Sequence, residues 1–250
     1  MKPLVQLLAF FVVLEVLAAR SPGQEGPPVP RAPQGGYSFG FGAGNVSEQW
    51  TYGNQVDSVH LYFEASRAIG EYAEIFGRLG WSNSVINEGL YVPLSATASD
   101  LSPNAFTPLL GAGIRSELFT HGSWTIGGTV SAVFHSEFTE YVSEYTNVYH
   151  RTWIHSISEY NATLTAITPI RDALFYFGPT VHFAYLDGVT EQFEVQPDQT
   201  NISRRIVTIR DKGSIAGVAG VQMPIHEVPV IAEIRIGDSI SGGISIFYPW

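Results

Sequence analysis

The sequence has no cysteine, and charged residues make up only 14% of its 250 positions. Without cysteine, neither a disulfide-stapled secreted scaffold nor a thiolate zinc site is available. Lysine and arginine number 13 against 23 acidic residues, so the formal net charge is −10, whereas nucleic-acid-binding proteins are usually basic. Hydrophobic residues reach 45%, which argues against disorder along the whole chain.

Glycine and aromatic residues are abundant instead, with 25 glycines and an aromatic fraction of 13%. Low charge combined with this composition is typical of a protein that faces something other than water. From residue 37 onward no run of eighteen apolar residues occurs, so no membrane-spanning helix is predicted there.

The first 36 residues read as an export signal and a linker. Met1 and Lys2 precede an apolar run of about fifteen residues, which is followed by the small residues Ala18 and Ala19. That run is short for a membrane-spanning helix. We therefore predict a signal peptide at 1–20, with a retained N-terminal anchor as the alternative. Proline and glycine are frequent in 21–36, which predicts a flexible linker before a single domain at 37–250.

From residue 37 the sequence alternates between apolar and polar positions. At the C-terminus, for example, Ile244, Ile246 and Tyr248 alternate with serine and glycine. A period of two predicts strands whose two faces meet different surroundings. About ten strands are predicted, near 37–46, 57–67, 72–82, 105–118, 123–138, 149–167, 174–189, 205–223, 229–236 and 239–250.

The predicted connections also alternate, between short turns and long polar loops. Transmembrane barrels have short periplasmic turns and longer external loops, and their strands need about 9–11 residues to cross a bilayer. The connection at 237–239 is an exception, because it should be external and yet is short. The fold class is therefore all-β, an antiparallel up-and-down transmembrane β-barrel of about ten strands. Eight strands stay an alternative, because 139–148 and 190–204 are themselves strand-like.

Most charged side chains fall on the polar face of these strands, as a barrel requires, because arginine or lysine on the lipid face costs about 2–4 kcal/mol. The exceptions are Arg67, which lies beside a predicted turn, and Asp187 and Asp211, all of which we expect outside the apolar band. A lone buried charge is costly, so we expect the charged residues of the polar face to form a paired network that plugs a narrow lumen. A narrow pore lined by mixed charge is the alternative. The predicted lumen charge network consists of Glu64, Glu74, Arg78, Arg115, Glu117, Glu137, Glu159, Glu233 and Arg235.

Four histidines share the predicted lumen face, namely His60, His135, His155 and His182. Histidine and carboxylate together can bind a metal ion, and histidine can form a proton-sensitive gate. No tight ligand spacing such as HxxxH or HExxH is present, which favours ordinary polar lumen residues. We therefore predict no cofactor and no definite metal site.

Aromatic residues near strand ends predict girdles at the two membrane interfaces. Those on the apolar face are Trp81, Trp124, Tyr248 and Trp250. A second group, Tyr141, Tyr145 and Tyr149, lies around a predicted external hairpin tip and offers anchors for an extracellular ligand or surface. These tyrosines could instead extend the girdle.

In this pattern, residues 37–250 resemble the bacterial outer-membrane β-barrel proteins of the OmpA/opacity-like type. The most specific part is the last strand, where Ile244, Ile246, Tyr248 and Trp250 match the aromatic-ended signal that the barrel-assembly machinery reads in those families. Pro249 is a departure, and Trp250 replaces the commoner phenylalanine. The resemblance implies a cell outer membrane location, with outer-membrane lipid and the assembly machinery as partners.

Enzyme motifs are not found. The sequence has no GxSxG elbow, no phosphate-binding glycine loop and no HExxH, and we find no counterpart of the aspartate pairs of outer-membrane proteases. We therefore expect a non-enzymatic barrel with a structural or surface-interaction role and no nucleic-acid partner. A narrow porin-like channel is one alternative. The other is a soluble secreted β-barrel that binds a small apolar ligand.

Overall fold

The computed structural model describes residues 27–28, 36–49, 55–86, 106–136, 139–145, 148–196, 199–210, 213–226, 228–238 and 240–250. In these ranges no helix is long and apolar enough to cross a membrane. The strands are β1 (Tyr37–Gln49), β2 (Gln55–Ile69), β3 (Ala73–Ile86), β4 (Thr107–His121), β5 (Trp124–His135), β6 (Thr139–Tyr145), β7 (Val148–Ile170), β8 (Ala173–Gln196), β9 (Gln199–Arg210), β10 (Ser214–Ile225), β11 (Val228–Ile236) and β12 (Ile240–Pro249).

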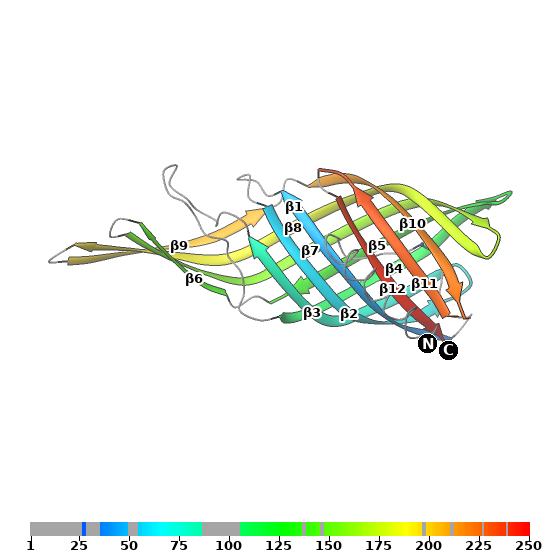
Figure 1. Ribbon diagram of the computed structural model, residues 1–250, viewed down its shortest axis with the longest axis horizontal. Helices are drawn as coiled ribbons and strands as arrows, with labels where there is room; N and C mark the ends of the chain where they lie inside the picture. Colours follow the sequence, from blue (N-terminus) through cyan, green and yellow to red (C-terminus); the bar gives the residue numbers. More distant parts are fainter. Residues whose placement is uncertain are drawn as a thin grey trace, which may run out of the picture.

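The strands form one antiparallel sheet that closes into a barrel (Figure 1). Ten strands make up its wall, in the order β7-β5-β4-β3-β2-β1-β12-β11-β10-β8, and the pairing of β7 with β8 closes the ring. The first and last strands are neighbours, and main-chain hydrogen bonds of 3.0 and 2.7 Å join Tyr37 and Trp250. The predicted ten-stranded up-and-down barrel is confirmed.

Strands β6 and β9 prolong two wall strands beyond the barrel. β6 continues β5 along β7, and β9 leads into β10 along β8. Together with the far ends of β7 and β8 they form a four-stranded sheet that projects from one end of the barrel (Figure 1). The first residues of β1, the C-terminal Trp250 and the turns at 70–72, 122–123 and 171–172 lie at the opposite end.

A line of one-residue insertions marks the level where this sheet leaves the barrel. His135 pairs with Ile157 but Thr139 pairs with Ile154, so the β5–β6 side carries one extra residue. The pairing of β7 with β8 shifts between Ile154 and Ser156. A third insertion separates β9 from β10, so the single strand predicted at 205–223 is wrong. Such bulges bend strands at barrel rims and change which face a side chain takes.

The two faces of the wall follow the predicted alternation. On β5, Val130 and Phe134 are 58% and 46% exposed, whereas Ser131 and His135 between and beyond them are buried. Large apolar side chains therefore cover the outside, and polar side chains fill the inside. A water-soluble barrel buries its apolar face, so the alternative of a soluble secreted barrel does not fit this arrangement.

Several glycines on the inner face lie directly opposite an aromatic ring on the next strand. A Cβ atom added at Gly42 would collide with the ring of Tyr62, and one added at Gly220 would collide with the ring of Tyr176. Gly40 with Phe247 and Gly113 with Phe76 repeat the arrangement. Part of the abundant glycine thus makes room for rings that fill the lumen.

Candidate functional site

The lumen holds a buried cluster of two arginines and two glutamates from β2, β3 and β4. Arg78 Nε donates a hydrogen bond of 2.9 Å to Glu64 Oε2. Arg115 donates to the other oxygen of Glu64, and its Nε lies 3.4 Å from Glu74 Oε1. All four side chains are almost fully buried. The two positive and two negative charges of this cluster therefore compensate each other away from water.

Strand register brings these charges together. Glu64 is the direct cross-strand partner of Arg78, and Glu74 is that of Arg115. The Phe76 ring packs under both guanidinium groups, with Cζ–centroid distances of 4.8 Å for Arg78 and 4.2 Å for Arg115. Cation–π contacts of this kind add to ion pairs that water does not screen.

A second cluster joins β11 to β7 and β8. Arg235 Nε donates to Glu233 Oε1 at 3.2 Å, and Arg235 Nη1 donates to Asn161 Oδ1 at 3.0 Å. The hydroxyl of Tyr176 donates to Glu233 Oε2 at 2.9 Å. β10 separates β11 from β8, and β10 and β8 separate β11 from β7, so these contacts run across the inside of the wall.

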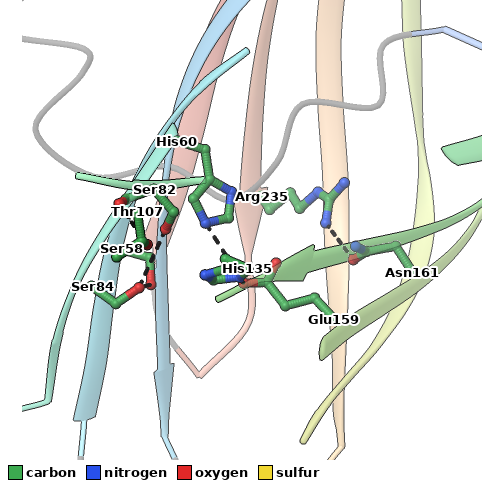
Figure 2. A network of polar contacts seen from close by, with 9 residues as sticks. All are labelled: Ser58, His60, Ser82, Ser84, Thr107, His135, Glu159, Asn161 and Arg235. Atoms are coloured by element: carbon green, nitrogen blue, oxygen red, sulfur yellow. Dashed lines mark hydrogen bonds and ion pairs between the residues drawn. The ribbon is translucent and has the colours of Figure 1, made fainter. Parts of the chain in front are cut away.

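The third cluster consists of His60 on β2, His135 on β5 and Glu159 on β7 (Figure 2). His135 Nε2 lies 2.7 Å from Glu159 Oε1, and His60 Nε2 lies 3.6 Å from the same oxygen. The two imidazole rings meet edge to face, with centroids 4.9 Å apart. Strands β3 and β4 separate β2 from β5 in the sheet, so His60 reaches its partners across the lumen.

Hydroxyl groups lie beside this third cluster, toward the end that carries the projecting sheet (Figure 2). Ser58 Oγ donates to Ser84 Oγ at 2.7 Å, and Thr107 Oγ1 donates to the main-chain oxygen of Ser82 at 3.1 Å. On β7 and β8 the inner face becomes apolar at the same level, because the cross-strand partners Ile157 and Leu186 are buried.

At the other end of the lumen, Pro27 and Pro28 are buried. The ring and carbonyl of Pro28 lie 2.7 and 2.8 Å from where a Cβ of Gly127 would be, on the inner face of β5. Pro27 and Pro28 are therefore buried at this end of the barrel, with Pro28 against its inner wall.

Two predicted lumen residues are placed differently by the structure. His155 is exposed, because it is the extra residue of the bulge between Ile154 and Ser156, where the alternation of faces is interrupted. Glu117 is only half-buried, at the register shift between Glu117 and Phe119 near the turn end of β4. His182 is buried on β8 opposite Asn161.

Some candidate residues lie outside the part of the chain that the structure describes. Glu137 is one, and the side chains of Tyr141, Tyr145 and Tyr149 are others. Sequence reasoning did not single out Tyr176, Asn161 or the hydroxyl cluster. Their position on the polar face was the available signal, but it does not say which polar side chains meet.

The predicted interface aromatics point outward. Trp81, Trp124, Tyr248 and Trp250 are all well exposed, with Trp250 the most exposed at 80%. Trp124, Tyr248 and Trp250 lie at the turn end of the barrel, whereas Trp81 lies in the other half. Ile244 and Ile246 alternate with buried serine and glycine on the last strand, so their side chains also take the outer face.

A scan against protein families finds no match, and neither does a search of curated proteins. Among solved structures, the translocator domain of the autotransporter NalP from Neisseria meningitidis matches with a TM-score of 0.50 at 12% identity, over 100% of this chain and 98% of that chain. The beta domain of the Bordetella autotransporter BrkA matches at 0.43 and 13%, over 87% and 100%. The outer membrane protease OmpT from Escherichia coli matches at 0.35 and 10%, over 85% and 91%.

The NalP likeness shows a shared fold and nothing finer, because the identity is low. The resemblance to OmpA- and opacity-like proteins stays a prediction. Together with the outward apolar face and the closed ring of ten strands, the likeness establishes that this chain has the fold of an outer-membrane β-barrel.

Proposed function

We propose that the protein is a non-conducting barrel of the outer membrane that presents its projecting four-stranded sheet at the cell surface. The observation that carries this proposal is the length of β7 and β8, which have 23 and 24 residues. A tilted strand needs only about 9–11 residues to cross a bilayer. The surplus, with β6 and β9 paired alongside, stands beyond the barrel as a surface-interaction element.

A closed lumen fits the same role. Barrels of about eight strands are filled by their own side chains, whereas sixteen-stranded porins hold water. Here Arg78, Arg115 and Arg235 are buried in ion pairs. The apolar pair of Ile157 and Leu186 lies above them, and Pro28 lies against Gly127 below. These layers support a plugged barrel over the narrow porin-like channel.

A barrel in the outer membrane would have two partners, the lipid around it and the assembly machinery that inserts it. Lipid would cover the exposed apolar side chains, and the assembly machinery would read the last strand through Tyr248 and Trp250. The signal peptide predicted at 1–20 would direct export. The proposal includes no enzymatic activity, in keeping with the motifs that the sequence lacks.

Surface presentation is tested with an epitope tag inserted between Tyr145 and Val148, at the tip of the β6–β7 hairpin. An antibody should bind intact cells that carry this insertion. The matched control is the same tag in the turn at 70–72, which should be reached only after the outer membrane is opened. Equal labelling of both insertions in intact cells, or labelling of the 70–72 tag alone, would contradict the proposed orientation.

The closed lumen is tested in planar lipid bilayers with the detergent-purified barrel. Folding is verified first by the shift in gel mobility on boiling that a transmembrane barrel shows. A folded preparation should give no steady conductance, with a porin as the positive control. Regular channel openings would favour the narrow-pore function instead. Deleting 140–149 and measuring cell adhesion tests the surface-interaction role, which unchanged adhesion would rule out for this hairpin.

A further inference from the structure

We propose that His60, His135 and Glu159 form a site inside the barrel for one divalent transition-metal cation of the zinc type. This inference goes beyond the surface role proposed above and does not depend on it. It rests on the geometry of three donor atoms, on the charge of the lumen and on a buried nitrogen that makes no hydrogen bond.

The donor atoms already converge. One nitrogen from each histidine and one oxygen of Glu159 all lie within 4.8 Å of one another. Around a tetrahedral zinc ion with bonds of about 2.0–2.1 Å, ligand atoms lie roughly 3.4 Å apart. The distances from Glu159 Oε1 to the two Nε2 atoms, 2.7 and 3.6 Å, fall on either side of that value. Small side-chain rotations would therefore suffice to admit the cation.

The charges of the lumen leave Glu159 without a permanent cation. Among the described residues, the buried carboxylates are Glu64, Glu74, Glu159 and Glu233, and the buried guanidinium groups are Arg78, Arg115 and Arg235. Four negative charges against three positive ones leave one negative charge. The arginines pair with Glu64, Glu74 and Glu233, whereas both ion-pair contacts of Glu159 are with histidines. A bound divalent cation would bring to Glu159 the positive charge that no arginine among the described residues gives it, and the sum of these buried charges would change from −1 to +1.

The buried Nε2 of His60 faces this site without a hydrogen-bond partner. It lies 3.6 Å from Glu159 Oε1, which is too far for a hydrogen bond. Buried polar atoms in folded proteins are normally satisfied, so an atom of this kind needs an explanation. Coordination to a metal ion would satisfy it, and the side chain is already directed at Glu159 across the lumen (Figure 2).

The donor set indicates which cations fit. Two imidazole nitrogens and one carboxylate oxygen suit zinc, nickel or copper, whereas calcium and magnesium prefer oxygen ligands. Three protein ligands leave a fourth position for water. The adjacent hydroxyls of Ser58, Ser82 and Ser84 offer a polar route toward the end that carries the projecting sheet.

The position of the site suggests what the metal does. His60 belongs to β2, whereas His135 and Glu159 belong to the neighbouring strands β5 and β7 across the lumen. One ion would thus join β2 to β5 and β7, which are not its neighbours in the sheet. A ligand that binds only the folded state raises its stability, so zinc should slow or shift unfolding.

The test measures Zn²⁺ binding by the folded, detergent-purified barrel with equilibrium dialysis and metal analysis. We expect one equivalent in the wild type. Loss of a residue that only hydrogen-bonds a metal ligand typically lowers metal affinity roughly 10–100-fold. The double variant His60→Gln/His135→Gln removes two ligands, so its affinity for Zn²⁺ should fall at least that much. The matched control is His155→Gln, which removes an exposed histidine from the same strand as Glu159 and should leave binding unchanged. Zinc should also raise the unfolding midpoint of the wild type and not that of the double variant.

Some outcomes would overturn the proposal. These are substoichiometric binding by the folded wild type, undiminished binding by the double variant, or loss of binding in His155→Gln. If the double variant does not show the heat-dependent gel shift, it has not folded and its binding cannot be compared. The visible absorption spectrum of Co²⁺ bound to the wild type is then the test. Strong visible absorption of a four-coordinate ion supports the site, and the weak spectrum of a six-coordinate, hydrated ion refutes it.

Discussion

Replacing Arg115 with methionine should be among the most damaging single changes in the barrel. Arg115 is fully buried and contacts both Glu64 and Glu74. At an effective dielectric constant of about 20, unit charges 3.4 Å apart, the separation of Arg115 Nε and Glu74 Oε1, attract by about 5 kcal/mol before desolvation is counted. Removing one partner of a buried ion pair costs about 3–5 kcal/mol, because the other charge stays buried. We expect a loss of that size for Arg115→Met.

The measurement is equilibrium unfolding by urea of barrels refolded into lipid vesicles, followed by tryptophan fluorescence. Arg67→Met is the matched control. Arg67 is exposed and its Cζ lies 5.5 Å from the centroid of the Tyr37 ring, so its removal should cost no more than about 1 kcal/mol. Adding Glu74→Gln to Arg115→Met should restore part of the lost stability, because both charges are then absent.

A loss below about 1 kcal/mol for Arg115→Met, equal to that of the control, would refute the reasoning. It would mean that water reaches the lumen charges and screens them. The closed-lumen proposal would then lose its main physical support, and the narrow pore would become the better description of the barrel.

Two further outcomes are expected. Gly220→Ala should lower the free energy of unfolding by about 1–3 kcal/mol, because the added Cβ would collide with the ring of Tyr176. Gly217→Ala on the same strand is the control and should change it little, because the atom nearest to the added Cβ would be 3.8 Å away. Equal effects of the two variants in the urea assay would contradict this packing. Trp250→Ala should reduce the fraction of the protein in cell membranes that shows the heat-dependent gel shift, while its refolding in detergent stays intact. Trp124→Ala should leave that fraction unchanged. Equal membrane yields of the two variants would argue against an assembly signal at the C-terminus.

The faces of the strands were predictable because alternation is a local property. Each strand has a period of two, so residues such as Val130 and Ser131 reveal their surroundings without knowledge of their neighbours. The same local rule correctly assigned Glu64, Arg78, Arg115 and Glu233 to the interior. It failed at His155, where a bulge interrupts the period.

Bulges were invisible to the sequence pattern because they depend on how two strands pair. The insertion between β9 and β10 appears only when both are aligned against β8. For the same reason, β6 and β9 could be recognised as strand-like, but not as the edges of a sheet that leaves the barrel.

The sequence by itself determined the all-β class and the faces that the polar and apolar side chains of each strand take, since these follow from periodicity and the cost of charge in lipid. It left ten or eight strands open, and the pairing of the strands decided for ten. Tertiary structure alone decided which lumen groups meet. His60 and Glu159 are 99 positions apart in the chain and come from β2 and β7, which β3, β4 and β5 separate in the sheet. Their contact depends on closure of the ring and on its width, and no pattern along a single strand carries that information.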